Sequence, residues 1–480
     1  MRTLPFVGRE NAFEQLNGLL QKKTATLAVV SGRRRIGKSR LIQEFGKNHR
    51  FLEFIGIPPD IGITADDQRA VFGQKLGRSI GFPALRANDW SDLFQMLAEQ
   101  TRHGRVIILL DEISWMATGD PTFLGKLKNA WDTEFKKNPE LILILCGSVS
   151  TWIEKNILSS TGFLGRIPLT IHLYELSLPD CNQLLEAQQF MGTSYDKFKL
   201  LSITGGIPWY LELIPPASTV QQCIKQLCFT PKAPLVNEFD RIFHDLFDSR
   251  GTIYKKIITA LASGPLEYNA ICDVLNSSSS GVVSDYLSEL IAANFITRDY
   301  TWSFKSGLFA RLSQFRLSDN YLRFYIKFIE PQLENINRGY FEDSRPEDLL
   351  GWHTVMGLQF ENLVIQNKKA LFKMLGIAPS EILLDNPYFQ RKTTRQQGCQ
   401  IDYLIQTRLN NLFVCEIKFS KNPIDSSVIS EVQEKIKRLT IPRRFSCIPI
   451  LIHVNGISDA VQDKGYFYKI IDFSDLFCYK

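Results

Sequence analysis

The chain has 480 residues, of which 44% are hydrophobic and 22% are charged. This composition excludes a disordered or fibrous protein and predicts a folded globular one. The length exceeds that of one ordinary core and predicts about two to four domains. The net charge of +6 permits an anionic partner without requiring one, because solvated surface charge explains it equally well.

Targeting and cysteine patterns narrow the class of protein further. The sequence starts MRTLPFVGRE and reaches a charged pair before any apolar run long enough for a signal peptide, and no later stretch of about 18 uncharged apolar residues occurs. We therefore expect a cytoplasmic protein with no membrane partner. The nine cysteines form no CxxC pair, which argues against a zinc ribbon or a disulfide framework and predicts mostly buried thiols.

The first predicted element that carries chemistry is a phosphate-binding loop. Residues 25–31 (ATLAVVS) predict a buried parallel strand. GRRRIGKS follows directly at residues 32–39 and matches the pattern GxxxxGK[ST]. The next segment predicts a helix with three apolar side chains on one face, Leu41, Ile42 and Phe45. Strand, loop and helix occur in the order that this motif requires.

Each signature position of the loop has a role in ATP binding. Gly32 and Gly37 let the backbone wrap closely around phosphates, Lys38 reaches the β and γ phosphates, and the Ser39 hydroxyl can bind magnesium. The predicted ATP-binding loop consists of Gly32, Arg33, Arg34, Arg35, Ile36, Gly37, Lys38, Ser39 and Arg40. The three consecutive arginines lie outside the signature positions, and solvated side chains are the default there.

Two further apolar strands end in polar residues. Residues 106–112 read VIILLDE, so Asp111 is predicted to hold magnesium and Glu112 to polarise the attacking water. Residues 141–150 read LILILCGSVS, and Ser148 would lie beside the γ-phosphate if the two strands are neighbours. A plain strand-to-loop turn remains the alternative for Ser148.

The first half of the chain resembles the archaeal-type ATPases of the AAA+/STAND group. The resemblance is carried by FVGRE at 6–10, GRRRIGKS at 32–39, LLDEISWMA at 109–117, CGSVSTW at 146–152 and TGGIPWYLEL at 204–213. It implies that the first segment lies near the adenine, that Ser148 senses the γ-phosphate, and that a Gly-x-Pro element in a helical lid meets the nucleotide. The ATP-binding residues that it adds are Phe6, Val7, Gly8, Arg9, Gly206 and Pro208.

Arg166 is a further candidate from the same resemblance. It lies in FLGRIPL, where relatives carry a Gly-Arg pair that completes a neighbour's site. The resemblance therefore implies a catalytic arginine and a homo-oligomer, since an arginine can neutralise charge on the transferred phosphoryl group. A surface arginine on a loop is the alternative.

The middle of the chain predicts a winged helix-turn-helix. Residues 252–300 give three helices and a β-wing, and Val283, Leu287 and Leu290 of the third helix would face the core. That helix is predicted to expose mainly Ser277, Ser278, Ser279, Ser280, Ser284, Asp285 and Glu289. It lacks the cations that hold phosphates, so DNA binding and protein contact both remain open. FRLSDNYLRFYIKFI at 315–329 again resembles the same family.

The last part of the chain alternates helix and strands. The predicted elements are a helix at 355–369, strands at 387–393, 400–406 and 411–418, a helix at 426–440 and a strand at 447–454. Asp402 lies on the second strand, and VCEIKFS places Glu416 and Lys418 on one face of the third.

These residues predict metal-dependent phosphodiester cleavage. Asp402 and Glu416 would bind Mg²⁺ or Mn²⁺, Lys418 would orient water or stabilise developing charge, and Glu361 on the preceding helix would complete the metal shell. The pattern resembles the PD-(D/E)XK nuclease superfamily. It departs from the motif that gives the superfamily its name, because the first acidic residue, Asp402, is followed by Tyr403 and is not part of a Pro-Asp pair. A solvated E-x-K face is the alternative.

We therefore expect an α/β protein with a P-loop parallel sheet and helical lid, a winged helix-turn-helix, and a C-terminal restriction-endonuclease-like domain. The predicted domains are the ATPase core at 1–175, the lid at 176–248, the winged helix with its connecting helix at 249–335 and the nuclease-like domain at 336–480. The leading hypothesis is that the ATPase binds ATP and magnesium and controls the C-terminal nuclease-like domain. That domain would act on nucleic acid, on DNA in preference to RNA. The alternatives are a nucleotide-switched signalling or scaffold protein with an inactive last domain, and a transcriptional regulator.

Overall fold

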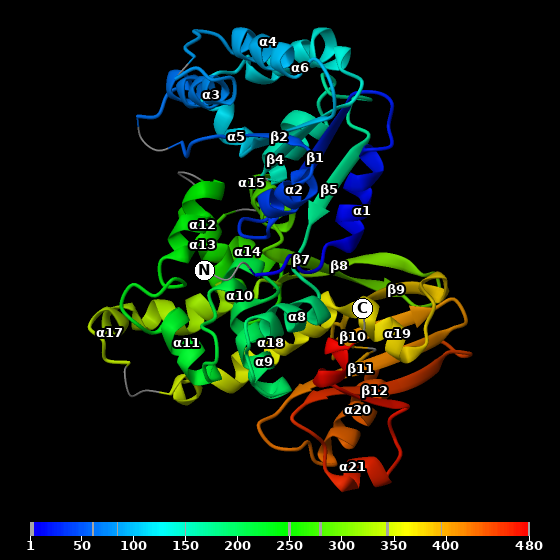
Figure 1. Ribbon diagram of the computed structural model, residues 1–480. Coiled ribbons are helices and arrows are strands. Elements are labelled where there is room, and N and C mark those ends of the chain that lie inside the picture. The colour runs from blue at the N-terminus through cyan, green and yellow to red at the C-terminus, as the bar shows by residue number, and fades with distance from the viewer. Residues whose placement is uncertain are drawn as a thin grey trace. The chain divides into compact units, whose positions relative to one another are not determined.

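The chain folds into two compact units. The computed structural model describes residues 4–59, 62–83, 85–148, 150–247, 251–277, 281–341, 345–394 and 396–478. One unit is Gly8–Glu175, and the other joins Met1–Val7 to Leu176–Lys480 (Figure 1). None of the described helices is long and apolar enough to cross a membrane. All nine cysteines are free and seven of them are buried, in agreement with the prediction.

The unit Gly8–Glu175 is built on a five-stranded parallel sheet with the order β2-β3-β4-β1-β5. Its strands are β1 (Thr26–Gly32), β2 (Arg50–Ile55), β3 (Val106–Asp111), β4 (Leu141–Gly147) and β5 (Leu169–Leu173). The three predicted strands are the inner ones, β1, β3 and β4. The predicted role of Ser148 required β3 and β4 to be neighbours, and these two strands do pair. The two edge strands were not predicted, because they are short and only partly buried and so lack a continuous apolar run.

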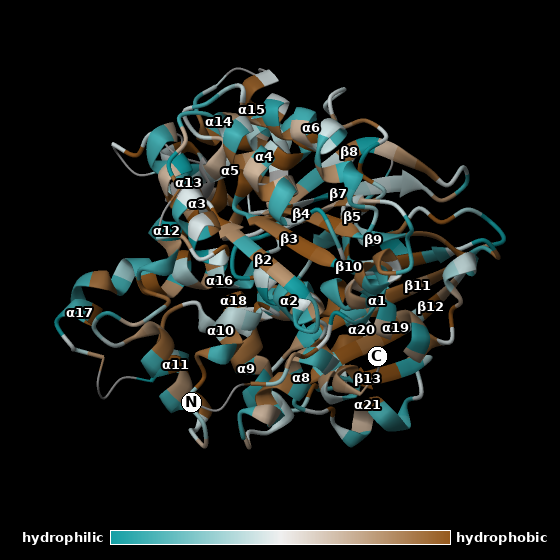
Figure 2. Ribbon diagram, turned by 45° about the horizontal axis from the view of Figure 1, so that its top comes forward, coloured by the Kyte–Doolittle hydropathy of each residue, from teal (hydrophilic) through white to brown (hydrophobic). Residues whose placement is uncertain are grey.

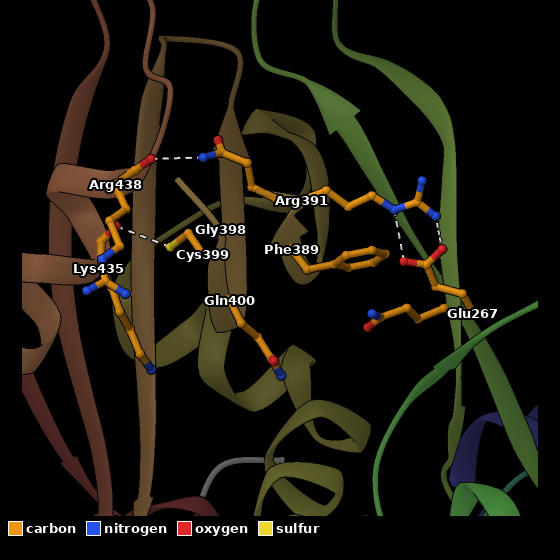
Figure 3. Close-up of a pocket in the computed structure, with 10 residues that line it drawn as sticks. Glu267, Phe389, Arg391, Gly398, Cys399, Gln400, Lys435 and Arg438 are labelled. Carbon is orange, nitrogen blue, oxygen red and sulfur yellow. Dashed lines mark hydrogen bonds and ion pairs between the residues drawn. The ribbon is translucent and has the colours of Figure 1, made fainter. Parts of the chain in front are cut away.

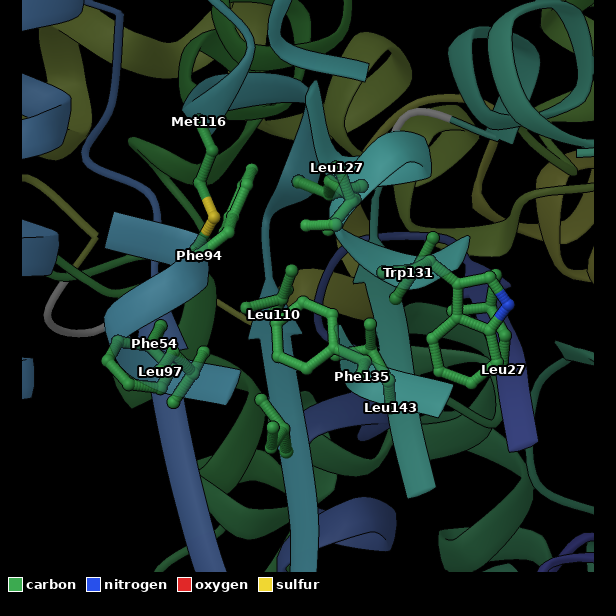
Figure 4. Close-up of a cluster of buried hydrophobic side chains, with 14 of the residues drawn as sticks. Leu27, Phe54, Phe94, Leu97, Leu110, Met116, Leu127, Trp131, Phe135 and Leu143 are labelled. Carbon is green, nitrogen blue, oxygen red and sulfur yellow. The ribbon is translucent and has the colours of Figure 1, made fainter. Parts of the chain in front are cut away.

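Helices cover this sheet and close its core. They are α1 (Glu10–Leu19), α2 (Lys38–Gly46), α3 (Ala65–Ser79), α4 (Trp90–Gln100), α5 (Ile113–Met116), α6 (Phe123–Thr133) and α7 (Ser150–Ile153). The three apolar side chains predicted to share a face of α2 are buried. Trp90, Phe94 and Phe123 pack on one another from α4 and α6. Figure 4 shows side chains of this core on both strands and helices, and Figure 2 shows how hydrophobic β3 and β4 are.

The second unit starts with a group of helices. They are α8 (Leu178–Ala187), α9 (Ser194–Thr204), α10 (Pro208–Glu212), α11 (Val220–Cys228) and α12 (Glu238–Phe247). Thr193 forms a capping box at the start of α9, and Pro208 occupies the first turn of α10, where its missing N–H costs nothing. Gly205, with a φ of 55°, ends α9 and lets the chain turn into α10.

A small α/β segment follows. It contains α13 (Gly251–Leu261), β6 (Leu266–Glu267), α14 (Tyr268–Val274), α15 (Gly281–Ala292), β7 (Ile296–Ser303) and β8 (Leu308–Leu317), and the strands form an antiparallel sheet of order β6-β8-β7. The three apolar residues predicted for the core side of α15 are buried. The predicted exposure of Glu289 is wrong, because it is partly buried and accepts a hydrogen bond from the Tyr254 hydroxyl. Ser278, Ser279 and Ser280 lie outside the described residues.

The C-terminal sheet has the order β13-β12-β11-β10-β9. After α16 (Asn320–Phe324) and α17 (Leu333–Asn337) come α18 (Trp352–Gln366), α19 (Lys368–Leu375), β9 (Ile382–Gln390), β10 (Cys399–Thr407), β11 (Asn411–Phe419), α20 (Ser427–Arg438), β12 (Ser446–Val454), α21 (Asp459–Asp463) and β13 (Lys469–Asp472). β9, β10 and β11 pair antiparallel, and β11, β12 and β13 pair parallel.

The predicted helix at 355–369 is two helices. The break falls at Asn367, whose amide nitrogen donates to Leu363 O at 2.8 Å and whose amide oxygen accepts from Leu178 N at 2.9 Å. An asparagine side chain that bonds to backbone in this way competes with helix continuation. The short elements α21 and β13 were also missed.

Candidate functional site

The phosphate-binding loop connects β1 to α2. Gly32 has a φ of 145°, and a Cβ placed there would lie 2.5 Å from the carbonyl oxygen of Leu173 in β5. Gly37, with a φ of 89°, precedes the first residue of α2. Both glycines are therefore required, one for close strand packing and one for a left-handed turn.

Lys38 is buried inside this loop, with 5% of its surface exposed. Its ammonium donates to the carbonyl oxygens of Gly32 and Arg33, both at 3.0 Å, and to the Ser148 hydroxyl oxygen at 3.1 Å. The structure thus brings the residue after β4 next to the loop, as the strand order requires. Three neutral acceptors hold the cation without cancelling its charge, which suits the binding of an anionic phosphate.

The two predicted magnesium ligands touch each other. The Ser39 hydroxyl donates to Asp111 Oδ2 at 2.6 Å, and Asp111 Oδ1 accepts from the backbone N–H of Glu112 at 3.0 Å. A hydroxyl and a carboxylate at this position are the donors that magnesium takes in P-loop sites. The donor set therefore fits the ion, and these two residues would hold it.

Glu112 is held in an unusual backbone conformation. Its φ of 49° and ψ of 53° lie in the left-handed region, which costs a non-glycine residue on the order of 1–3 kcal/mol. Its Oε1 accepts from the Ser148 hydroxyl at 2.6 Å and its Oε2 accepts from the Ser148 backbone N–H at 3.1 Å. The carboxylate predicted to act on water and the serine predicted to sense phosphate are thus directly bonded.

Arg9 also reaches the loop, since its guanidinium donates to Ile36 O at 3.0 Å. Arg33 is only 3% exposed, so the default of a solvated side chain is wrong there; a guanidinium that leaves water needs polar partners inside the protein. Arg34 and Arg35 are partly buried.

The remaining predicted nucleotide contacts divide between the two units. Gly8, Ile36 and Arg40 belong with the loop to the unit Gly8–Glu175. Phe6, Val7, Gly206 and Pro208 lie in the other unit. Within that unit, the Gly206 carbonyl accepts from Leu176 N at 2.7 Å.

Arg166 is bound within its own chain. Its guanidinium donates to both carboxylate oxygens of Asp132 on α6, at 3.0 and 2.9 Å. The hydrogen bonds from Arg166 hold the pKa of Asp132 well below its usual range, and Asp132 raises the pKa of Arg166. Lys128 and Lys136 also contact this carboxylate, at 3.1 and 2.9 Å. A bidentate pair of this kind must open before Arg166 can serve another site.

A second polar cluster lies in the C-terminal sheet. Glu416 on β11 is 1% exposed, and its Oε2 accepts from the Lys435 ammonium of α20 at 2.5 Å. Asp402 on β10 lies 3.4 Å from the same ammonium, and its Oδ2 accepts from Ile417 N at 2.8 Å. The pairing of β10 with β9 is irregular between Ile401 and Leu404, and such bulges often redirect a side chain beside a site.

Lys418 completes this cluster on the solvent side. Its ammonium lies 3.2 Å from Glu416 Oε1 and 2.7 Å from Glu431 Oε2 of α20. The two predicted residues of the E-x-K pattern therefore share a face, as their spacing required. Tyr403, the departure from the family pattern, donates its hydroxyl to Asp385 on β9.

Two carboxyl groups here, those of Asp402 and Glu361, have raised pKa values. Burial, with the Glu416 charge nearby, raises the pKa of Asp402 to about 6. Burial, with the Asp402 charge nearby, raises the pKa of Glu361 on α18 to about 7. Although burial alone lowers the pKa of Lys435, the charges of Asp402 and Glu416 outweigh it and raise that pKa. The acids repel one another, and this repulsion is what a cation placed between them relieves.

The predicted shell of three carboxylates is not assembled as a metal-binding group. No group of three or more His, Cys, Asp or Glu side chains suited to a metal ion occurs within the described parts of the chain. The Lys435 ammonium contacts both Asp402 and Glu416. Mg²⁺ is usually held by one or two carboxylates with water, so the oxygens of these two residues still fit the ion. Sequence reasoning missed Lys435 and Glu431, although their spacing of four puts them on one face of a helix.

Three comparisons with known proteins bear on the chain. Residues 6–214 match a family described as an ATPase domain predominantly from Archaea. MJECL04, an uncharacterized protein of Methanocaldococcus jannaschii, is 26% identical over 384 residues, which cover 78% of this chain and 81% of that protein. The Walker-type ATPase PABY2304 of Pyrococcus abyssi has a TM-score of 0.50 at 17% identity and covers 67% of this chain and 96% of its own.

A further solved structure, the ORC2 protein of Aeropyrum pernix in complexes with ADPNP and ADP, has a TM-score of 0.42 at 12% identity and covers 71% of this chain and 97% of its own. The fold shared with the Pyrococcus ATPase, the family match and the assembled loop agree. Residues 6–214 are therefore an ATP-binding ATPase domain of the archaeal P-loop type.

Proposed function

We propose that the chain is an ATPase whose nucleotide cycle controls a metal-dependent nuclease site in its C-terminal domain. The observation that carries the proposal is the partly buried cluster of Asp402, Glu416, Lys418 and Lys435, which lies in the same compact unit as the predicted lid. An acidic pair with two lysines has the groups needed to hold a divalent ion and to neutralise a phosphodiester.

For ATP hydrolysis we assign roles to the residues around the loop. Magnesium, when bound, neutralises phosphate charge, and Ser39 and Asp111 are its donors. Lys38 binds the β and γ phosphates, and Glu112 takes the proton of the attacking water. Because the Ser148 hydroxyl donates to Glu112 at 2.6 Å, turning this hydroxyl toward the γ-phosphate would free the carboxylate for water. The serine thereby links phosphate sensing to activation of the base.

For nucleic-acid cleavage we assign Asp402 and Glu416 to the divalent ion, with Glu361 beside Asp402. A bound Mg²⁺ or Mn²⁺ would polarise the scissile phosphate. Lys418, held at 3.2 Å from Glu416, orients the water or stabilises the charge that develops. The proposed substrate is nucleic acid, with DNA favoured over RNA. In the ATPase domain, Ser148 and Arg166 would respond to the bound nucleotide, with Arg166 acting on a neighbouring copy in a homo-oligomer.

Helix α9 supplies a physical route for control. The rings of Tyr195 and Phe198 on α9 stack with Phe419, at centroid distances of 6.5 and 5.3 Å. Phe419 follows Lys418 on β11. The other end of α9 leads into the Gly-x-Pro element at Gly206. A shift of α9 on nucleotide binding would therefore be transmitted to the strand that carries the acidic cluster.

A buried polar network joins the same elements. Gln359 of α18 donates to Ser202 O of α9 at 2.8 Å and to Asn320 O of α16 at 2.6 Å. The Arg323 guanidinium, 1% exposed, donates to Gln359 Oε1 at 2.7 Å. Such networks fix one arrangement of the packed elements, because an unpaired buried polar group is costly. Glu361 lies on the same helix as Gln359, two residues further on.

Loss of the aromatic contact should uncouple the two sites. We expect Phe198→Leu to leave ATP hydrolysis within about twofold and to reduce ATP stimulation of cleavage by about threefold to tenfold, since an aromatic pair contributes about 0.5–1.5 kcal/mol. Steady-state ATPase and cleavage rates measure this. Tyr340→Leu, at a 67% exposed ring in the same unit, is the matched control. Equal ATP stimulation in both variants would contradict transmission through α9.

The direct test uses the purified full chain with ATP, Mg²⁺ or Mn²⁺ and labelled single- and double-stranded oligonucleotides. We expect cleavage that depends on both the divalent ion and ATP. No cleavage under any of these conditions, with ATP hydrolysis intact, would exclude the nuclease part of the proposal.

One observation favours a second function, a nucleotide-switched protein whose last domain only binds. The Lys435 ammonium already contacts both Asp402 and Glu416, so in an inactive domain this cation would occupy the place of a metal ion. Metal binding measured without any activity distinguishes the two functions.

The raised pKa values of Asp402 and Glu361 determine how the stability of the protein, and its response to a metal ion, should change with pH. Asp402 and Glu361 titrate near 6 and 7, above their ordinary values of 3.8 and 4.5, so the folded chain binds their protons more tightly than the unfolded chain does. Their stabilising effect is fully present below about pH 4 and is lost as the pH rises through 6 to 7. Each of the two pKa values rises by roughly two units, and each unit corresponds to about 1.4 kcal/mol, so the loss is on the order of several kcal/mol.

Divalent ions should restore this stability at pH 8 and have little effect at pH 5, where protons occupy the carboxyl groups. We expect Mn²⁺ to raise the melting temperature by about 2–4 °C at pH 8, measured by thermal unfolding without nucleotide. Asp402→Asn should remove the shift, and Asp111→Asn, in the loop site, should keep it. No shift at pH 8 in the wild type would favour the second function.

A further inference from the structure

A cavity of about 440 Å³ adjoins the acidic cluster. It lies between the sheet of β6, β8 and β7 and the C-terminal elements β9, β10 and α20. Its lining includes Glu267, Phe389, Arg391, Gln400, Lys435 and Arg438. Figure 3 shows Lys435 and Arg438 on one side, the ion pair of Arg391 with Glu267 on the other, and Phe389 and Gln400 between them.

The lining of this cavity is cationic. Three cations, Arg391, Lys435 and Arg438, face one carboxylate, Glu267. Arg391 donates its Nε to Glu267 Oε1 at 3.0 Å, and Arg438 donates its Nε to Glu434 at 3.0 Å. Each guanidinium has five N–H donors, so a single carboxylate partner leaves donors over for an anionic ligand.

Lys435 belongs to the cavity and to the acidic cluster at once. It lines the cavity and contacts Glu416 at 2.5 Å and Asp402 at 3.4 Å. The Cys399 thiol donates to the backbone carbonyl of Lys435 at 3.2 Å and fixes the position of this turn of α20. An anion that enters the cavity would compete with the two carboxylates for the Lys435 ammonium.

We infer that this cavity binds the phosphodiester backbone of a single-stranded polynucleotide and guides the strand to Asp402 and Glu416. The inference rests on the proposed nuclease function. A volume of this size suits a ligand of nucleotide size and is too small for a double helix. Cationic walls with an aromatic side chain between them are what single-strand sites combine. A phosphate that draws Lys435 away from the carboxylates leaves their oxygens for the divalent ion.

The test measures binding of fluorescein-labelled oligothymidylate to the full chain by anisotropy, in EDTA so that no cleavage occurs. We expect Arg438→Gln to weaken binding about fivefold at 0.1 M salt, because one single-strand phosphate contact contributes a salt slope of about 0.7. Lys437→Gln, the same charge change at an exposed position of α20 outside the cavity, should bind within about twofold of the wild type.

A pair of variants separates charge from structure. Arg391→Gln and Glu267→Gln both break the same ion pair, yet the first removes a cation from the cavity and the second removes an anion. We expect the first to weaken binding and the second to strengthen it. Weaker binding in both variants would mean that the Arg391–Glu267 ion pair only maintains the local structure and does not contact the ligand, and this result would overturn the inference.

Three other results also overturn it: no binding by the wild type, equal losses in Arg438→Gln and Lys437→Gln, or preferred binding of the duplex of the same sequence. Failure of the nuclease proposal looks different. In that case the wild type cleaves nothing with Mg²⁺ or Mn²⁺, while the expected order of binding among the variants persists.

Discussion

Replacing Glu112 by glutamine should slow ATP hydrolysis by a factor on the order of 100 to 10,000 and leave ATP binding close to that of the wild type. General-base catalysis contributes about this much. The amide of the new side chain has the size of the carboxylate and its oxygen can still accept from Ser148, which lies 2.6 Å from Glu112 Oε1, but it cannot take a proton. Phosphate release gives the rate, and titration with a fluorescent ATP analogue gives the affinity.

Lys38→Ala provides the contrasting result. Removal of this buried ammonium, which donates to Gly32, Arg33 and Ser148, should weaken ATP binding as well as hydrolysis. Lys22→Ala, at an exposed position of the same unit, should change neither. If Glu112→Gln kept more than about a tenth of the wild-type rate, another group would be the base.

Replacing Glu416 by glutamine should have the second-largest effect and lower nucleic-acid cleavage by a factor on the order of 100 or more. The carboxylate is 1% exposed and carries one of the two charges that attract the divalent ion, and loss of such a ligand removes most of the transition-state charge stabilisation that the metal gives. ATP hydrolysis should stay within about twofold, because Glu416 lies outside the ATPase domain.

Cleavage by the Glu416→Gln variant is compared with that of Glu381→Gln, which makes the same change at an exposed position of the same domain. Both variants are checked by their ATP hydrolysis and thermal unfolding. Because the amide oxygen of the introduced glutamine can still accept a hydrogen bond from Lys435, we expect the Glu416→Gln variant to fold. Equal cleavage by the two variants would mean that Glu416 does not bind the catalytic ion.

The elements around the phosphate loop could be predicted because their signals are local. The run before Gly32, the spacing to Lys38 and the acid at Asp111 all lie within short, buried strands or directly after them. Burial on both faces turns such strands into continuous apolar runs. The contact of Ser148 with Lys38 then follows from the pairing of β1 with β4.

The missed features depend on contacts between distant residues. Lys435 reaches Glu416 across 19 positions, and Arg166 reaches Asp132 across 34, and no local pattern marks either pair. A lysine on a helix is most often a solvated charge, so only the fold could assign Lys435 to the acidic pair. The burial of Arg33 is likewise a property of the folded loop.

Lys435 has a consequence for how the protein responds to metal supply. Small metalloproteins whose ligands lack any other counter-ion unfold when the metal is removed. Here the chain supplies its own cation to Asp402 and Glu416, so these buried acids do not depend on a metal for folding. Scarcity of divalent ions would then silence the proposed cleavage reaction and leave the protein intact, ready to resume when the ions return.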